Sequence, residues 1–172
     1  MEIKPLETPT EVYGALMVNN LAWREAYQDL LPDEVIDRVP AEPPEEHVEE
    51  LYDSVGGDEE VFLVAVDEAK YVRGYIYVRW GDETKEFVGE TEAGLKEIYV
   101  HPEWWGQGIG TALLDEALDM LPSSIEAIRL EMLAGNEDAH EFYLARGFEL
   151  AGHSEFSIGG EPYPTDIYVR SL

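Results

Sequence analysis

The stretch from Leu95 to Leu114, LKEIYVHPEWWGQGIGTALL, constrains the fold more than any other part of the chain. It begins with β-forming residues, and Pro102 ends any strand pairing soon after them. Three alternate glycines, Gly106, Gly108 and Gly110, come next, and apolar residues then recur at helical spacing. The stretch therefore predicts a strand, a glycine loop and the N-terminus of a helix.

This glycine loop favours an anionic ligand. Glycine lets the backbone turn tightly and bring its N–H groups close to a ligand. The first turn of the following helix carries unpaired N–H groups and the positive end of the helix dipole. A phosphate or pyrophosphate fits such a place, although a tight turn without a ligand explains three glycines equally well.

Two motifs resemble the signatures of the GCN5-related N-acetyltransferase (GNAT) family. The first, VxPxxxGxGxG, runs from Val100 to Gly110, and the helix-opening residues Thr111 to Leu114 follow it. The second, NxxAxxFYxxxGF, runs from Asn136 to Phe148. Their order and separation are those of the family, so the resemblance is firm over residues 95–148 and looser over the first 90 residues.

The resemblance implies an α+β fold, an α/β/α sandwich of GNAT type with a mixed, mostly antiparallel central sheet. It implies one N-acetyltransferase domain over residues 1–172. The pattern of the chain agrees, with an unbroken apolar strand over 61–66 and an alternating partner over 71–80. A further strand over 128–132 precedes the second signature helix, which Gly147 ends. Strands over 148–153 and 163–169 close the chain as an antiparallel pair.

The first helix is expected to begin at a Thr10 cap and to end at Pro32. Trp23 and Tyr27 lie four residues apart on it. The same region of many family members holds part of the acceptor substrate, and core packing is the alternative for these two aromatic residues.

The resemblance also implies acetyl-CoA as the co-substrate. The pyrophosphate would rest on the backbone of the glycine loop, and the pantetheine arm would pair with the strand before it. The implied cofactor-binding residues are Ile98, Tyr99, Val100, Gly106, Gln107, Gly108, Ile109, Gly110, Thr111, Asn136 and Tyr143. Trp105 stands where the family carries Arg or Gln, so we expect a weakened or rearranged phosphate contact, with Gln107 placed to substitute.

Three residues are candidates for the chemistry. The resemblance gives Tyr143 the role of the acid that protonates the departing thiolate, with aromatic packing beside Phe142 as the alternative. Glu131 is the first candidate for the base, and Glu97 is its rival, acting through water. Burial would raise the pKa of such a carboxyl toward a useful value. The chain has 38 acidic residues, so a solvated surface position is the alternative for each carboxylate.

The function predicted from these features is transfer of an acetyl group from acetyl-CoA to a primary amine. The chain has no cysteine and no GxSxG motif, which favours direct attack in a ternary complex. The acceptor is a small amine or a peptide N-terminus. A non-catalytic acyl-CoA-binding module is one alternative. An NAD-dependent oxidoreductase is the other, because Glu131 falls where a ribose-binding acid belongs, but Thr111 replaces the last glycine of the dinucleotide motif.

Charge limits the partners of this chain. Thirty-eight acids against eleven bases give a net charge of −27, which would repel nucleic acid and anionic membranes, so we expect neither. Dispersed acids with few lysines resemble the proteins of salt-in halophiles, whose molar salt shortens the Debye length to about 3 Å. Such screening would let an acidic protein bind a polyanionic coenzyme. An acidic surface suits a cationic amine as acceptor, although a halophilic surface would look the same.

Other sequence features narrow the location and the ligands. Without cysteine, and with four scattered histidines, no metal site is expected. The start of the chain lacks the basic and apolar regions of a signal peptide, and no apolar run approaches the roughly 18 residues of a membrane span. We therefore expect a cytoplasmic protein, and a homodimer is compatible with the sequence.

Overall fold

The computed structural model describes residues 1–172 and contains one seven-stranded sheet in the order β1-β2-β3-β4-β5-β7-β6. Neighbouring strands run antiparallel, except that β4 and β5 are parallel. The expected α+β fold with a mixed, mostly antiparallel sheet is confirmed. The strands are β1 (Glu2–Pro5), β2 (Glu60–Val66), β3 (Val72–Arg79), β4 (Glu92–Val100), β5 (Ala127–Leu133), β6 (Glu149–Ile158) and β7 (Glu161–Ser171).

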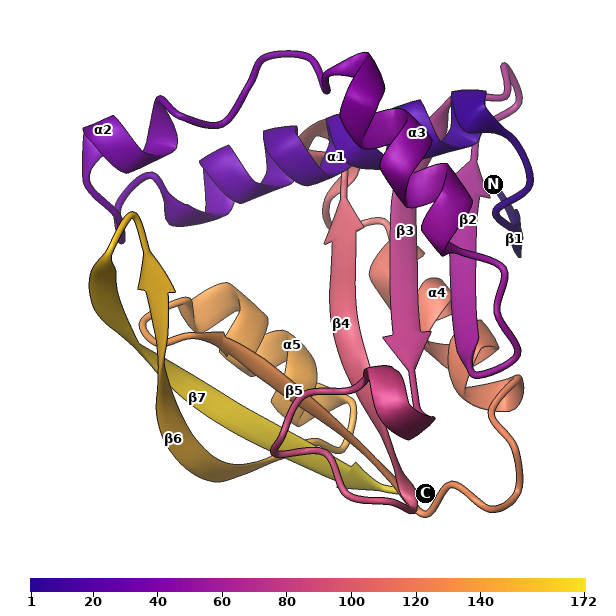
Figure 1. Ribbon diagram of the computed structural model, residues 1–172, viewed down its shortest axis with the longest axis vertical. Helices are drawn as coiled ribbons and strands as arrows, with labels where there is room; N and C mark the ends of the chain where they lie inside the picture. Colours follow the sequence, from indigo (N-terminus) through magenta and orange to yellow (C-terminus); the bar gives the residue numbers. More distant parts are fainter.

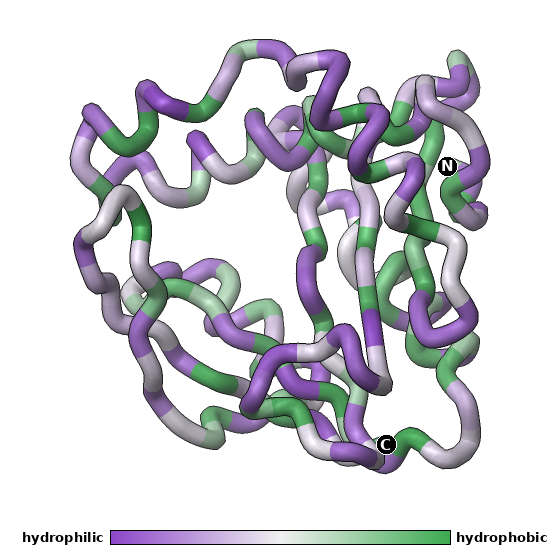
Figure 2. Tube along the Cα trace, viewed as in Figure 1, coloured by the Kyte–Doolittle hydropathy of each residue, from purple (hydrophilic) through white to green (hydrophobic).

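Helices cover both faces of this sheet (Figure 1). They are α1 (Pro9–Tyr27), α2 (Asp33–Ile36), α3 (Glu45–Ser54), α4 (Ile109–Asp119) and α5 (Glu137–Ala145). The larger apolar cluster lies under α4 and α5, and a smaller one lies under α1. None of the helices is both long and apolar enough to cross a bilayer. Figure 2 shows β2 as a nearly continuous apolar strand.

Strands β4 and β5 stay together only at their beginnings. Their parallel pairing joins 92–94 to 127–129 and then stops. Beyond that point β4 continues along β3, with a bulge at Lys96, while β5 continues along β7. The two strands diverge from this shared base in Figure 1. The upper half of each strand therefore has one edge without a strand partner, and we call the space between these edges the wedge.

The closing hairpin is longer than the sequence indicated. β6 and β7 pair continuously from Glu149↔Val169 to Ile158↔Glu161, apart from one irregularity near Gly152. Gly159 and Gly160 form the turn, with φ of 60° and 86°. Glycine adopts such angles without strain, which is why the turn falls there. The hairpin tip packs against α1 and α2 through Ile158.

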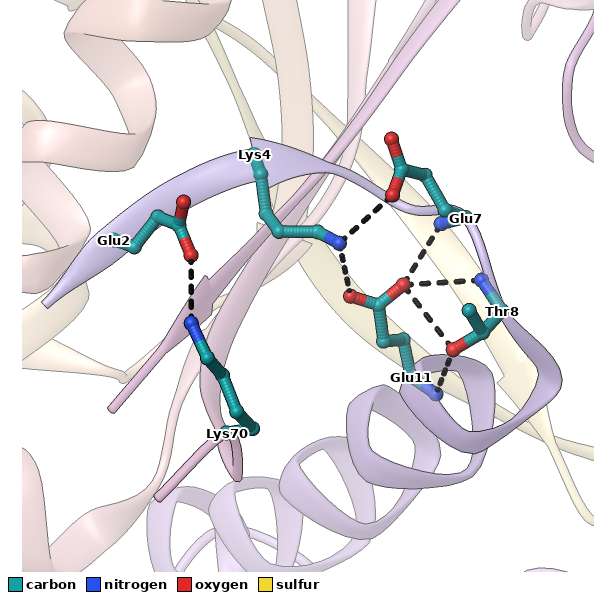
Figure 3. Close-up of polar contacts among 6 residues, drawn as sticks. All are labelled: Glu2, Lys4, Glu7, Thr8, Glu11 and Lys70. Carbon is teal, nitrogen blue, oxygen red and sulfur yellow. Dashed lines mark hydrogen bonds and ion pairs between the residues drawn. The ribbon is translucent and has the colours of Figure 1, made fainter. Parts of the chain in front are cut away.

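Helix α1 begins two residues earlier than a Thr10 cap would allow, so the expected Thr10 cap was wrong. Thr8 is the N-cap, and Pro9 already has the first helical position. The Thr8 hydroxyl accepts from the Glu11 N–H at 3.2 Å, and the Glu11 carboxylate accepts from the Thr8 N–H at 3.0 Å. This reciprocal capping box satisfies two N–H groups at once, and Lys4 binds the same carboxylate at 2.8 Å (Figure 3).

Replacing Thr8 by alanine should lower the free energy of unfolding by about 1 kcal/mol, because the N-terminal N–H groups of α1 lose their side-chain acceptor. Thr10→Ala is the matched control, since the Thr10 side chain is exposed within the helix and makes no hydrogen bond. Urea unfolding followed by circular dichroism measures both. A larger loss for Thr10→Ala than for Thr8→Ala would contradict the assigned cap.

Candidate functional site

The glycine loop leads directly into the N-terminus of α4. Gly106 and Gly108 have φ of 78° and 82°, a region that side chains disfavour, and Gly108 is the N-cap of the helix. No side chain caps this end, and the first turn contains no acidic residue. In a chain with 38 acids, the positive end of an 11-residue helix is thus left unopposed. Such an end is suited to an anionic ligand.

Gly110 matters for helix packing, unlike the two glycines before it, which shape the loop. A Cβ at this position would lie 3.2 Å from the ring of Phe142 on α5. The lack of a side chain therefore lets α5 pack closely against the first turn of α4. This contact places the second sequence motif beside the first.

An arginine that the sequence analysis did not single out lies at the same place. Arg146 Nε donates to the Thr111 hydroxyl at 2.8 Å, and Nη1 donates to the Phe142 carbonyl at 2.9 Å. Its guanidinium also covers the Phe142 ring at 3.8 Å from the centroid. In the sequence, an arginine just before Gly147 indicates only a favourable charge at a helix C-terminus. Its position beside the start of α4 is a tertiary contact.

The indole of Trp105, the residue expected at the family's Arg or Gln position, faces the end of β4. Its Nε1–H donates to the Val100 carbonyl at 2.7 Å. The N–H of the next residue, His101, donates to the Arg73 carbonyl at the start of β3, and the direction of backbone groups alternates along a strand. The Val100 carbonyl therefore points away from β3, into the wedge. Trp105 thus covers one acceptor of the free β4 edge.

Four polar side chains gather where the wedge meets α1. Tyr27 comes from the end of α1, Tyr99 from β4, and Asn136 and Tyr143 from the start and middle of α5. Burial raises the pKa of the Tyr27 hydroxyl, while polar contacts with Asn136 and Tyr99 limit the rise. Asn136 is also the N-cap of α5 and accepts from the Ala139 N–H at 3.2 Å. Tyr27 therefore belongs to a small core cluster and also lies beside the polar groups of the wedge.

Tyr143 is 8% exposed and lies among other aromatic rings. Its ring packs on Phe148 and Tyr168, with centroids 5.4 and 6.1 Å away. Burial, together with the neighbouring Tyr27 and Tyr168, raises the pKa of the Tyr143 hydroxyl above its ordinary value. The hydroxyl stays protonated at neutral pH, so it is able to donate a proton but does not act as a base.

The two candidate carboxylates have different surroundings. Glu131 has both oxygens occupied, because Oε1 pairs with Lys85 at 3.0 Å and Oε2 accepts from the Thr165 hydroxyl at 2.7 Å. Glu97 accepts from the Tyr75 hydroxyl through Oε2 alone, at 2.7 Å. Asn19 in turn donates to that hydroxyl at 2.8 Å. Glu97 therefore keeps one carboxylate oxygen without a protein partner.

Glu97 also belongs electrostatically to the tyrosine cluster. Burial raises the pKa of the Tyr99 hydroxyl well above its usual value, and the proximity of Tyr27, Glu97 and Tyr143 raises it further. Glu131 lies elsewhere, beside Lys85 and Leu95 where β4 and β5 are still close. The structure brings Glu97, Tyr99, Asn136 and Tyr143 together and leaves Glu131 in an ion pair.

The whole arrangement suits a long, partly anionic ligand. A phosphate group would bind at the start of α4, and an extended arm would lie along the free edge of β4. The far end of the arm would then reach a protonated tyrosine and a carboxylate with a free oxygen. Such an arrangement is able to move a proton at the end of an anchored chain.

Comparisons with known proteins agree with this geometry. The model of the Acetyltransferase (GNAT) family matches residues 20–148, well over half of the chain. A curated relative, peptidyl-lysine N-acetyltransferase YjaB of Salmonella typhimurium, is 32% identical over 83 residues. That match covers 48% of this chain and 54% of the relative, so the chain spans about half the length of the curated relative.

Solved structures extend the similarity to the whole chain. A PaiA N-acetyltransferase from Thermoplasma acidophilum in complex with coenzyme A superposes with a TM-score of 0.76 at 21% identity, covering 99% of this chain and 98% of that one. A ribosomal-protein-alanine N-acetyltransferase from Brucella melitensis gives a TM-score of 0.74 at 20% identity, covering 100% of both chains. At these identities the two structures establish a shared fold.

Proposed function

Because the chain belongs to the acetyltransferase (GNAT) family, we propose that it transfers an acetyl group from acetyl-CoA to a primary amine. The observation that carries this proposal is the wedge, which joins an unopposed helix N-terminus to a buried, protonated Tyr143 along one free strand edge. A small amine or a peptide N-terminus is the acceptor class. The curated relative is named for peptidyl-lysine, which is also a primary amine.

The residues that would hold the coenzyme follow from this placement. The backbone N–H groups from Gly106 to Thr111 would bind the diphosphate, and Arg146 would add a guanidinium beside them. The free backbone groups of Ile98 and Val100 would pair with the amides of the pantetheine arm, once the Trp105 indole releases the Val100 carbonyl. On this proposal, Arg146 supplies the charge that position 105 lacks.

The chemistry is a direct displacement. The amine nitrogen attacks the thioester carbonyl carbon, and the carbon–sulfur bond breaks as the new carbon–nitrogen bond forms. Tyr143 gives its proton to the departing thiolate, and Glu97 takes the proton that the amine loses. Glu97 suits the role of base better than Glu131, because Glu131 has both oxygens engaged.

We also propose that the protein works at high salt. At a net charge of −27, the acidic side chains repel one another and also repel a polyanionic coenzyme. Salt shortens the range of this repulsion, from about 10 Å at 0.1 M to about 3 Å in molar KCl. The melting temperature should therefore rise between 0.1 and 2 M KCl. In 2 M KCl, acetyl-CoA at a hundredfold excess over its Kd should add about 2.7 kcal/mol, which is a shift of several degrees.

Thermal unfolding with acetyl-CoA, and with NADH as the control, measures these shifts. A shift with NADH alone would favour the oxidoreductase instead.

The Arg146→Gln variant should lose most of the acetyl-CoA shift, because the guanidinium beside Thr111 is gone. Arg79→Gln is the matched control, since Arg79 lies over the Tyr77 ring at the base of β3, away from α4. Equal shifts in both variants would remove Arg146 from the phosphate site.

Tyr143→Phe should lower kcat tenfold or more while the KM for acetyl-CoA changes little, because the ring still packs but the proton donor is lost. Release of free thiol during the reaction measures both constants. Tyr168→Phe is a neighbouring buried tyrosine and serves as the control, with a small effect on kcat expected. An unchanged kcat in Tyr143→Phe would exclude Tyr143 as the acid.

Glu97→Gln should lower kcat tenfold or more, since a glutamine accepts no proton. Glu131→Gln should instead reduce stability, because Lys85 loses its ion-pair partner, and should leave kcat nearly unchanged. Initial rates at saturating substrate, with urea unfolding in parallel, separate the two outcomes. The reverse pattern would assign the base to Glu131.

A further inference from the structure

A second cavity adjoins the site on the face that carries α1. Its volume is about 460 Å³, within the usual range for small-molecule sites. One side of α1 forms its floor, through Asn19, Asn20 and Trp23. The segment between α2 and α3 covers it, and the turn between β6 and β7 closes one end.

Polar contacts fix the cover of this cavity to α1. Asn20 Nδ2 donates to the Pro40 carbonyl at 3.1 Å, and the Arg24 guanidinium donates to the Val39 carbonyl. Val39 and Pro40 both line the cavity. The cavity is therefore formed before any ligand enters.

The charge of the cavity is opposite to that of the molecule. The chain carries 38 acidic residues, yet none of the cavity-lining residues is acidic. The lining instead includes the guanidinium of Arg38 and the imidazole of His47. Gly159 in the β6–β7 turn makes room for Arg38, because a Cβ there would lie 2.7 Å from Nη1.

Arg38 is one of six basic residues, out of eleven, that have no carboxylate partner. Lys4, Lys70, Lys85, Arg73 and Arg129 all form ion pairs in this acid-rich chain. Arg38 forms none, although it lies exposed at the rim of the cavity. Because it lines the cavity and has no partner within the chain, this guanidinium is able to bind an anion from outside.

Two contacts join the cavity to the reacting groups. Asn19, in the cavity floor, donates to the Tyr75 hydroxyl that donates in turn to Glu97. Trp23 packs edge-on against Tyr27, with ring centroids 5.3 Å apart, and Tyr27 contacts Asn136 beside Tyr143. The cavity floor is thus connected to the proposed base through Tyr75 and to the side of the proposed acid through Tyr27.

We propose that this cavity binds the acceptor, and that it selects an amine that also carries an anionic group, with a carboxylate as the simplest case. Arg38 binds the anionic group, and the amine points past Asn19 and Trp23 toward Glu97. This inference rests on the proposed acetyltransferase function. It is the reverse of the cationic acceptor that the net charge of the chain suggests.

Matched acceptors test the proposal. A panel of short α- and ω-amino acids is compared with the methyl esters and the decarboxylated amines of the same skeletons, at one fixed KCl concentration. For the best amino acid, kcat/KM should exceed that of its ester and amine at least tenfold. Arg38→Gln should raise the KM for the amino acid at least tenfold, leave kcat/KM for the uncharged-end amines unchanged, and leave the acetyl-CoA thermal shift unchanged. Arg38→Lys should restore part of the loss.

Arg79→Gln is the control for removing one arginine charge, and it should behave as the parent protein. Calorimetry of the same ligands on the protein loaded with coenzyme A gives a second reading that does not need turnover. Higher kcat/KM for esters, polyamines or lysine peptides than for amino acids would overturn the anionic acceptor class while leaving acetyl transfer intact. If amino acids neither bind nor react, the assignment of the cavity is wrong. A missing acetyl-CoA shift would instead contradict the proposed function.

Discussion

The parting of β4 and β5 is the constraint on which the rest of the structure depends. Two parallel strands that paired along their whole length would leave no free edge inside the sheet. Here pairing ends after Gly94 and Arg129, and the edges beyond are open. Free edges usually invite unwanted pairing. In this fold α1 and the β6–β7 hairpin meet across the top of the wedge through Tyr27, Leu31 and Ile158, so the open edges face a confined space.

The distribution of charge follows the same geometry. A net charge of −27 would favour acids everywhere on the surface, yet the first turn of α4 and the lining of the α1 cavity contain none. These two places lie at opposite ends of the proposed reaction path. An acid at either place would weaken binding of an anionic ligand by direct repulsion, which high salt only partly screens. On our proposal, these two regions lack acidic residues because each binds an anionic group, whereas the rest of the surface is rich in acids.

Much of the fold could be predicted because its signals are local. The glycine loop, the apolar strand over 61–66 and the C′ position of Gly147 are each encoded within a few residues. The Thr10 cap was the wrong choice between two nearby hydroxyls, and Pro9 together with Glu11 decided for Thr8. The site was harder to predict. The functions proposed for Arg38, Tyr27 and Arg146 depend on contacts between elements far apart in the chain, and no spacing in the sequence reveals such contacts.

The choice between Glu97 and Glu131 has the same physical origin. Both are strand glutamates, and the sequence alone ranks them only by resemblance. What distinguishes them is the partner of each carboxylate. Glu97 accepts a hydrogen bond from Tyr75, whereas Glu131 forms an ion pair with Lys85. Glu131 therefore has no oxygen left for an incoming proton, whereas Glu97 keeps one that faces no protein partner.

On our proposal, a contact between the two signature helices supplies the charge that Trp105 does not offer. The guanidinium beside the start of α4 comes from α5, the helix that also carries Tyr143. Gly110 allows this closeness, because any side chain there would meet Phe142. On our proposal, one helix, α5, therefore contacts the phosphate end of the coenzyme through Arg146 and its reactive end through Tyr143. Binding at one end then favours correct placement of Tyr143 at the other, since Arg146 and Tyr143 are fixed to one rigid turn of α5.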